Sequence, residues 1–228
     1  MKKSVYVVDL KMINYQKAYN IQMIIHKLCH ARQMRDTILF LETKPTITIG
    51  RSGSISDLLM DENDYVKQNI EVVPIDRGGD ITYHGPGQLV VSFIAHVKEH
   101  TNNIHHFLRL LEEVIIVCLK KYNISASRKE QLSGVWVNDK KIASIGISVE
   151  HGVTRHGFAL NINNDLSFFD LIIPCGLVGV TMTSIKECTN QAINKSQVKQ
   201  DIVQCFKEVF DVDIEVMKYT KGMFEHEN

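Results

Sequence analysis

The chain has 228 residues, 44% of them hydrophobic, with 26 basic and 26 acidic residues and a formal net charge of zero. This length fits one large domain or two small ones, and the apolar fraction is sufficient for a sizeable core. A nucleic-acid binder usually shows a clustered basic excess, which is missing here, so the expected partners are small molecules or protein domains.

Apolar periodicity predicts three long helices and several strands along the chain. The predicted helices cover residues 15–32, 104–118 and 196–210, each with an apolar stripe at helical spacing. The predicted strands cover residues 4–9, 37–42, 46–49, 70–75, 89–97 and 153–162, and a hairpin over 134–149 turns at Asn138-Asp139. Helices and strands are mixed without regular βαβ alternation, which favours an α+β fold with a mixed sheet flanked by helices. No linker or repeat interrupts residues 1–228, so we expect a single domain.

The apolar runs are short. Leu89 to Ala95 is one of the longest and cannot cross a membrane. Met1-Lys2-Lys3 is followed by an alternating stretch, not by the continuous apolar block of a signal peptide. We therefore expect a cytoplasmic protein.

A glycine-rich segment is the most unusual part of the sequence. It reads Arg77-Gly78-Gly79-Asp80-Ile81-Thr82-Tyr83-His84-Gly85-Pro86-Gly87-Gln88. Such a run makes a poor helix and a poor regular strand, but glycines let a ligand come close to the backbone. The segment indicates either the wall of a ligand site or a surface hairpin with Gly-Pro-Gly at its tip. It is not a phosphate-binding loop, because neither the P-loop nor the GxGxxG pattern is present.

The chain contains five cysteines, and the sequence settings of four of them can be compared with that of the fifth. Cys29, Cys118 and Cys205 lie on the apolar stripes of helices, where cysteine behaves as a small hydrophobe. Cys188 falls in a polar stretch that we expect to be a loop. Cys175 differs, because Pro174 before it and Gly176 after it would hold a thiol still and leave it accessible. A lone cysteine is usually inert, so a nucleophilic role for Cys175 also requires a group that activates the thiol.

A lysine in the predicted hairpin is one candidate for that group. Alternation from residue 141 onward places Lys141 on one face with Ala143, Ile145 and Ile147. A desolvated amine there would be a usable base, whereas a strand-end lysine could equally extend to water. A one-residue bulge would exchange Lys140 for Lys141. The remaining candidates are His84, His151 and His156.

Four motifs in order resemble those of the lipoyl(octanoyl) transferases, the octanoyltransferases of lipoate biosynthesis. They are the segment from Arg77 to Gln88, then Lys141-Ile142-Ala143-Ser144-Ile145-Gly146, His156-Gly157-Phe158-Ala159-Leu160-Asn161, and Pro174-Cys175-Gly176. Weaker similarity extends upstream through Tyr15, Ala18, Gln22 and Gly50-Arg51.

The resemblance implies a biotin/lipoate-ligase catalytic fold and transfer of an octanoyl group to protein lysines. The donor would be octanoyl-acyl carrier protein, and the acceptors would be lipoyl domains of E2 subunits or the glycine-cleavage H protein. Cys175 would be the acyl-thioester nucleophile, and Lys141 would lower the pKa of that thiol. No cofactor or metal is implied, and neither nucleic acid nor membrane is an expected partner. The implied substrate-binding residues are Arg77, Gly78, Gly79, Asp80, Ile81, Thr82, Tyr83, His84, Ser144, Ile145, Gly146, Gly157, Phe158 and Ala159.

Three alternative functions fit parts of the same pattern. A lipoate–protein ligase of this fold would activate a free acid with ATP and would need no nucleophilic cysteine. A thioesterase would pass the acyl group to water instead of to a lysine. A non-catalytic module would bind an acyl group or a carrier protein and leave Cys175 unreactive.

Overall fold

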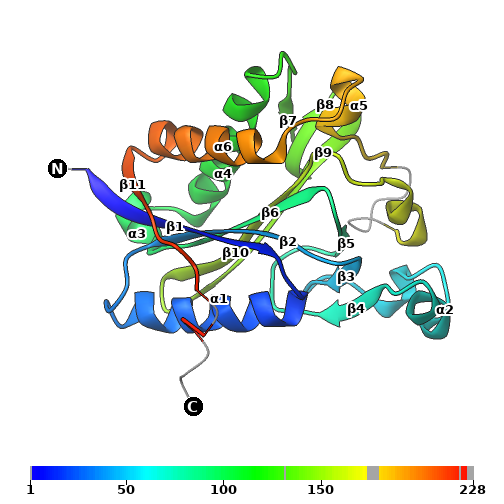
Figure 1. Cartoon of the computed structure of the whole chain (residues 1–228), viewed down its shortest axis with the longest axis horizontal. Helices are drawn as coiled ribbons and strands as arrows, with labels where there is room; N and C mark the ends of the chain where they lie inside the picture. The colour runs from blue at the N-terminus through cyan, green and yellow to red at the C-terminus, as the bar shows by residue number, and fades with distance from the viewer. Residues whose placement is uncertain (1, 131, 174–179, 221, 225–228) are drawn as a thin grey trace.

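The computed structural model describes residues 2–130, 132–173, 180–220 and 222–224. An eight-stranded mixed sheet runs through this part of the chain (Figure 1), in the order β11–β1–β2–β6–β10–β9–β8–β7. The pairs β11–β1 and β1–β2 are parallel, and the others are antiparallel. Its strands are β1 (Lys3–Met12), β2 (Thr37–Glu42), β6 (Gln88–Ile94), β7 (Ser127–Lys129), β8 (Leu132–Val137), β9 (Lys140–Glu150), β10 (Val153–Asn161) and β11 (Val212–Val216).

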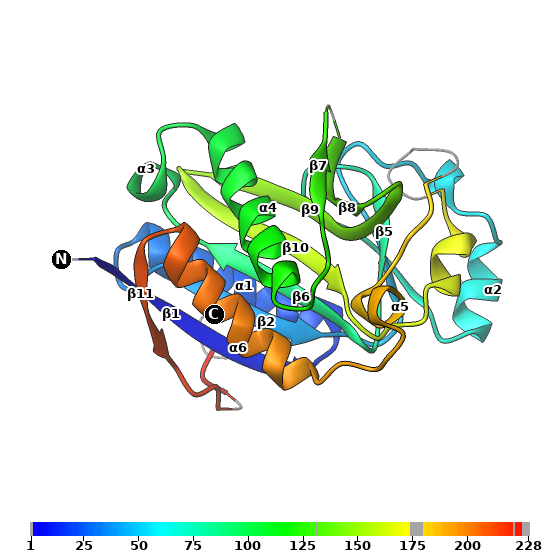
Figure 2. The ribbon, with the colours of Figure 1, turned by 90° about the horizontal axis from the view of Figure 1, so that it is seen from above.

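Helices cover both faces of this sheet. Helix α1 (Tyr15–His30) lies along one face, and α4 (Ile104–Lys120) and α6 (Lys195–Val209) lie along the other, as Figures 1 and 2 show. The shorter helices are α2 (Glu62–Lys67), α3 (Val97–His100) and α5 (Ile185–Thr189). No helix in the described ranges is both long and apolar enough to cross a bilayer. The α+β architecture with helix-covered mixed sheet confirms the predicted fold class.

Asparagine caps begin all three long helices. The side-chain oxygens of Asn14, Asn103 and Asn194 accept main-chain N–H groups of the first turn, at 3.2, 2.8 and 2.9 Å. Each cap satisfies an N–H group that the helix itself leaves without an acceptor. Local sequence therefore defines where these helices begin, and their apolar stripes define how they pack.

A second sheet of three strands lies beside the large one. Its order is β4 (Glu71–Pro74), β3 (Thr46–Ile49), β5 (Ile81–His84). Strand β5 belongs to the glycine-rich segment, so the prediction that this run makes a poor strand is wrong for these four residues. All four are buried, which also excludes a surface hairpin. The glycines with left-handed backbone, Gly79 (φ 82°) and Gly87 (φ 89°), stand outside the strand, and β3 supplies a distant pairing partner.

The apolar core explains the three helical cysteines. Cys29, Cys118 and Cys205 are fully buried, as predicted. Cys118 on α4 and Cys205 on α6 belong to the same core cluster, and burial raises the pKa of the Cys29 thiol to about 12. Cys188 was expected in a loop but lies half-buried on the short helix α5. Cys175 lies outside the described residues.

Candidate active site

A cavity of about 290 Å³ opens between α1, the large sheet and the chain that leads into β5. It gathers predicted site residues from three separate motifs. Those that line it are Arg77, Gly79, Asp80, Ile81, Thr82, His84, Lys141, Ser144, Ile145, Gly146, Gly157, Phe158 and Ala159. Their catalytic and binding roles stay predictions, but the fold brings them to one place.

Two predicted residues do not line this cavity. Gly78 lies behind it, where its N–H donates to the Ile147 carbonyl at 2.9 Å. Tyr83 faces the other side of β5 and stacks on Phe168 at 4.8 Å between ring centroids. Alternation along β5 therefore sends Thr82 and His84 one way and Tyr83 the other. Cys175 was the central catalytic prediction, and the described residues do not include it.

Glycines allow the segment before β5 to lie directly against its neighbours. A β-carbon at Gly146 would stand 2.6 Å from the Gly78 carbonyl oxygen, and one at Gly50 would stand 2.4 Å from the Gly79 oxygen. Real β-carbons do not approach so closely, so larger residues would push the segment away. The Ser52 N–H also donates to the Gly79 oxygen, at 3.1 Å. These contacts hold the segment as one wall of the cavity.

The floor of the cavity is a row of facing residues on four adjacent strands. Ser144 on β9 pairs with Ala159 on β10, Ala159 with Val90 on β6, and Val90 with Leu41 on β2. The next row contains Gly146, Gly157 and Ser92. Small side chains leave space above the sheet, and α1 closes that space with Tyr15, Ala18, Tyr19 and Gln22.

Strand β9 contains one extra residue near its start, and this changes the predicted orientation of Lys141. Trp136 on β8 pairs with Lys141, but the preceding Val135 pairs with Ala143. Ile142 and Ala143 both enter the core under α4, so strict alternation fails here. The alternation predicted that Lys141 would share the core face with Ala143 and Ile147. In the structure, Lys141 instead lines the cavity together with Ser144. The expectation that Lys141 is buried and Lys140 exposed is nevertheless confirmed, since Lys141 is 2% exposed.

The surroundings of Lys141 tie it to the chain that follows Cys175. The Lys141 N–H donates to the Thr181 carbonyl, and its carbonyl accepts from the Thr183 N–H, both at 2.9 Å. Its ammonium nitrogen lies 5.6 Å from the centre of the Trp136 ring, a cation–π contact. On the other side of the cysteine segment, the Ile173 N–H donates to the Asp57 carbonyl at 2.8 Å. Both described flanks of residues 174–179 are thus anchored by main-chain hydrogen bonds.

A buried hydrogen-bond network runs behind the cavity from His84 toward Lys141. His84 Nδ1 lies 2.9 Å from Gln88 Oε1, and Gln88 Nε2 donates to Asn161 Oδ1 at 2.9 Å. Asn161 Nδ2 donates to the Thr183 carbonyl at 3.0 Å, and the Thr183 N–H binds Lys141. Since Gln88 Oε1 can only accept, His84 carries its proton on Nδ1.

The surroundings of His84 make it a weak base near neutral pH. Its Nε2 faces the Thr48 hydroxyl at 3.2 Å, and Arg77 Nη2 donates to the same hydroxyl at 2.9 Å. Burial, together with the nearby Arg77 charge, lowers the pKa of His84 to about 3. Of the alternative bases, His84 therefore stays neutral with both ring nitrogens engaged.

A second polar cluster centres on Asp76 at the α1 side of the cavity. The carboxylate accepts from His156 Nε2 at 2.7 Å, from the Tyr19 hydroxyl at 3.1 Å, and from Arg155. The His156 hydrogen bond, followed by that of Arg155, holds the pKa of Asp76 well below its usual range. Burial lowers the pKa of His156 despite this carboxylate. His156 lines the cavity with φ of 62°, a strained conformation for a non-glycine residue. His151, another candidate base, is exposed and does not line the cavity.

The sequence analysis did not assign the wall that α1 contributes to the site, although the weaker similarity included Tyr15, Ala18 and Gln22. Tyr15, Ala18, Tyr19 and Gln22 follow the i, i+3, i+4, i+7 spacing of one helix face. A polar glutamine on that buried face was a detectable signal, since Gln22 is 5% exposed and accepts the His156 N–H. The other cavity residues outside the predicted set are Leu41, Ser52, Val90, Ser92, Leu132 and Ser133.

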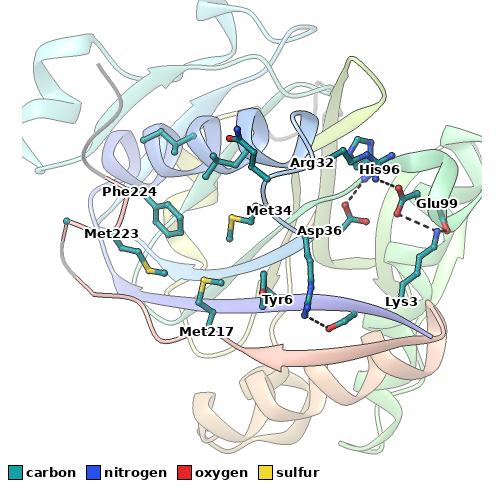
Figure 3. Close-up of a pocket in the computed structure, with 16 residues that line it drawn as sticks. Lys3, Tyr6, Arg32, Met34, Asp36, His96, Glu99, Met217, Met223 and Phe224 are labelled. Atoms are coloured by element: carbon teal, nitrogen blue, oxygen red, sulfur yellow. Dashed lines mark hydrogen bonds and ion pairs between the residues drawn. The ribbon is translucent and has the colours of Figure 1, made fainter. Parts of the chain in front are cut away.

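A larger hollow of about 850 Å³ lies elsewhere, between β1, the chain after α1, and the C-terminal residues Met217 and 222–224 (Figure 3). None of the motif residues that the structure describes lines it. Its charged side chains pair with acids, as Arg32 does with Glu99 and Arg35 with Glu215. The smaller cavity is therefore the candidate active site. Among the described residues, no group of three or more His, Cys, Asp or Glu could hold a metal ion.

Comparison with known proteins shows which family the chain resembles. Residues 14–207 match the family model described as Lipoyl protein ligase A/B catalytic domain. The octanoyltransferase of Syntrophotalea carbinolica is 42% identical over 199 residues, which cover 87% of this chain and 91% of that protein. The chain belongs to the octanoyltransferase family. The Flavobacterium psychrophilum octanoyltransferase is 37% identical over 231 residues, covering 94% of this chain and all of that protein. Membership in this family confirms the resemblance carried by the motifs.

Solved structures share the fold at low sequence identity. A bi-partite lipoate protein ligase from Thermoplasma acidophilum, studied with its E2 lipoyl domain, has a TM-score of 0.78 at 16% identity. That match covers 96% of this chain and 88% of the ligase. Biotin protein ligase from Aquifex aeolicus has a TM-score of 0.51 at 14% identity, covering 92% of this chain and 70% of that enzyme. These neighbours confirm the biotin/lipoate-ligase fold predicted for the octanoyltransferase family.

Proposed function

We propose that this acyltransferase moves an octanoyl group from octanoyl-acyl carrier protein to a lysine of lipoyl domains, through a thioester on Cys175. The observation that carries the proposal is the position of Lys141. It is buried at one end of the cavity and its main chain is hydrogen-bonded to residues 181 and 183, just after the cysteine segment. A desolvated amine beside a thiol activates that thiol as a nucleophile.

The proposed reaction has two acyl-transfer steps. Lys141 takes the proton of Cys175, and the thiolate attacks the carbonyl carbon of the donor thioester. The carrier thiol leaves with the proton from the Lys141 ammonium, so one thioester replaces another. The neutral acceptor lysine then attacks the enzyme thioester, Lys141 accepts the proton of that amine, and the Cys175 thiolate leaves. The product is an amide on the acceptor protein, and neither step consumes ATP.

The cavity supports an acyl substrate with a reactive head. Its Lys141 end is polar, with Ser133 and Ser144 nearby, whereas Ala18, Leu41 and Val90 form an apolar surface beneath α1, beside the polar Tyr19, Gln22 and His156. Ligand sites commonly combine an apolar body with few convergent polar groups. This arrangement of polar and apolar side chains suits a thioester carbonyl at Lys141 and a hydrocarbon tail against the apolar surface beneath α1.

The proposed partners are protein domains that carry the acyl group in and receive it. The donor is octanoyl-acyl carrier protein, and the acceptors are lipoyl domains of E2 subunits or the glycine-cleavage H protein. The lipoate protein ligase of similar fold was studied with its E2 lipoyl domain, which supports an acceptor of this kind. We place the reaction in the cytoplasm, where the adjacent Cys118 and Cys205 would remain thiols.

Intact-mass measurement tests the proposal. Wild-type protein incubated with octanoyl-acyl carrier protein and no ATP should gain one octanoyl group, and Cys175→Ser should gain none. Cys188→Ser is the matched control, because Cys188 is the half-buried cysteine among those described, and it should acylate as the wild type does. An octanoyl adduct on Cys175→Ser would contradict the assignment.

Adding acceptors to the isolated acyl-enzyme separates the alternatives. A lipoyl domain should remove the octanoyl group within the time of one turnover, with a matching mass increase on its lysine. Rapid loss to water without acceptor would indicate a thioesterase. A requirement for free octanoate and ATP would indicate a ligase, and an unreactive thiol would indicate a binding module.

A further inference from the structure

The candidate cavity ends beneath α1, on the side opposite Lys141. The strands β9, β10, β6 and β2 are consecutive in the sheet, and adjacent strands lie about 4.8 Å apart. The facing row from Ser144 to Leu41 therefore crosses about 14 Å of the sheet surface. The row thus has the dimensions of a medium-chain acyl group.

Side-chain size increases along this row. Near β9 and β10 the floor consists of Ser144 and Ala159 of this row and of Gly146 and Gly157 of the next, which leave space above the sheet. At β6 and β2 the first row ends in Val90 and Leu41, and Ala18 of α1 closes the space above them, while Ser92 of β6 continues the second row. The space is therefore open at the end that holds Lys141 and narrows at the end beneath α1.

Beyond this narrow end the side chains are closely packed. Ala18 and Leu41 are each 4% exposed and belong to the core between α1 and the sheet, together with Val8, Leu10 and Ile25. Val90 is only partly buried and packs against the same core, because its side chain also faces the cavity. Interiors are close-packed, so a longer chain could not extend past these side chains without displacing them.

We propose that Val90, with Ala18 above it and Leu41 beside it, sets the longest acyl chain that the enzyme accepts. This inference rests on the proposed function, because it takes Lys141 as the reacting end of the site. The terminal carbons of the acyl group contact these three side chains. Each methylene beyond that limit must displace packed atoms, and each missing methylene leaves a gap at the same place.

Two substitutions move the limit in opposite directions. Val90→Ala removes two methyl groups from the floor, so the ratio of decanoyl to octanoyl transfer should rise about 10-fold, the usual effect of one or two methylenes in an apolar pocket. Ala18→Val adds two methyl groups on the α1 side of the cavity and shortens the space for the acyl chain. The ratio of hexanoyl to octanoyl transfer should therefore rise by a similar factor. Both changes are small and preserve apolar character.

The neighbouring residue Val91 supplies a matched control. Val91 is fully buried on the opposite face of β6, in the core beneath α4 and α6. Val91→Ala is the same chemical change one residue away, so it should lower stability at least as much as Val90→Ala. It should leave the ratios among acyl chains unchanged, because its side chain does not reach the cavity.

The experiment is a competition among acyl donors. Wild type and the three variants are mixed with equal concentrations of hexanoyl-, octanoyl-, decanoyl- and dodecanoyl-acyl carrier protein, and the acyl-enzymes are resolved by intact mass. Opposite shifts for Val90→Ala and Ala18→Val, with none for Val91→Ala, support the inference. Unchanged profiles in both cavity variants, with acylation intact, overturn it. Failure of the wild type to acylate at all would instead overturn the proposed function.

Discussion

The buried network behind the cavity can be tested by removing its central residue. Asn161 is 1% exposed and takes part in three hydrogen bonds, with Gln88, Asn164 and the Thr183 carbonyl. Replacing it with alanine leaves the Asn164 amide and the Thr183 carbonyl without these partners in a site that water does not reach. Gln88 keeps its bond to the Tyr83 carbonyl at 3.1 Å, so it loses least.

The expected loss of stability follows from the number of buried polar groups left without a hydrogen-bond partner. An unsatisfied buried polar group costs about 1–3 kcal/mol, so two such groups should lower the free energy of unfolding by about 2–6 kcal/mol. In a protein of this size each kcal/mol moves the melting temperature by about 2–4 °C. We therefore expect the melting temperature to fall by about 4–24 °C in Asn161→Ala. The acylation rate should also fall, because the Thr183 main chain contacts Lys141.

Asn163 provides the control for this experiment. Its side chain makes two hydrogen bonds to the main chain of Ile193, at 2.7 and 2.9 Å, but the residue is partly exposed. Water can replace those bonds, so Asn163→Ala should cost about 1 kcal/mol. Urea unfolding of both variants measures the difference. If Asn161→Ala is no more destabilising than Asn163→Ala, the network does not stabilise the site and our reasoning about it is wrong.

Three further changes test other parts of the site. Lys141→Met should abolish acyl transfer and move the midpoint of alkylation of the nucleophilic thiol toward pH about 8.5, whereas the exposed Lys140→Ala should stay active. Gly146→Val should lower acylation at least about 10-fold, since a β-carbon there would stand 2.6 Å from a carbonyl of the covering segment. Because the pKa of His84 falls from 6.5 to about 3 on folding, the unfolded chain binds the extra proton as pH falls between these values. His84 should thus remove about 1.4 kcal/mol of stability per pH unit below 6.5, and His84→Gln should flatten that slope in urea titrations at each pH.

A specific outcome would contradict each of these three predictions. An alkylation midpoint that shifts in Lys140→Ala but not in Lys141→Met would assign activation to the other lysine. Normal acylation by a folded Gly146→Val protein would mean that the covering segment does not limit substrate entry. An identical pH slope in wild type and His84→Gln would show that the imidazole is not kept neutral by burial.

Local patterns predicted much of this fold because they report local causes. The stripe on residues 104–118 predicted α4, and the Asn138-Asp139 turn predicted the β8–β9 hairpin. The burial of Cys118 and Cys205 followed from the same periodicity. Where pairing partners are distant, the patterns failed. Strand β5 forms because β3, more than thirty residues earlier, lies beside it.

The candidate site was likewise predicted only in part from the sequence. Motif order identified most of the cavity lining, including the stretches around Gly146 and Ala159. The pattern did not reveal that Ala18 and Val90 close one end, because their meeting depends on how α1 crosses the sheet. Nor could it show the orientation of Lys141, since strict alternation assumes that facing strands advance residue for residue.

The extra residue in β9 means that the position of Lys141 depends on a local irregularity of the strand as well as on residue identity. Lys141 and Ser144 are three positions apart, and in a regular strand side chains an odd number of positions apart point to opposite faces. Because Ile142 and Ala143 both face the core, the bulge returns Lys141 to the face of Ser144. Deleting one of these two core residues would leave a two-residue interval, and a regular pleat would then keep the lysine on the cavity side. A bulged three-residue interval and a regular two-residue interval therefore present the same lysine, so a search for relatives by one fixed spacing would miss the other kind.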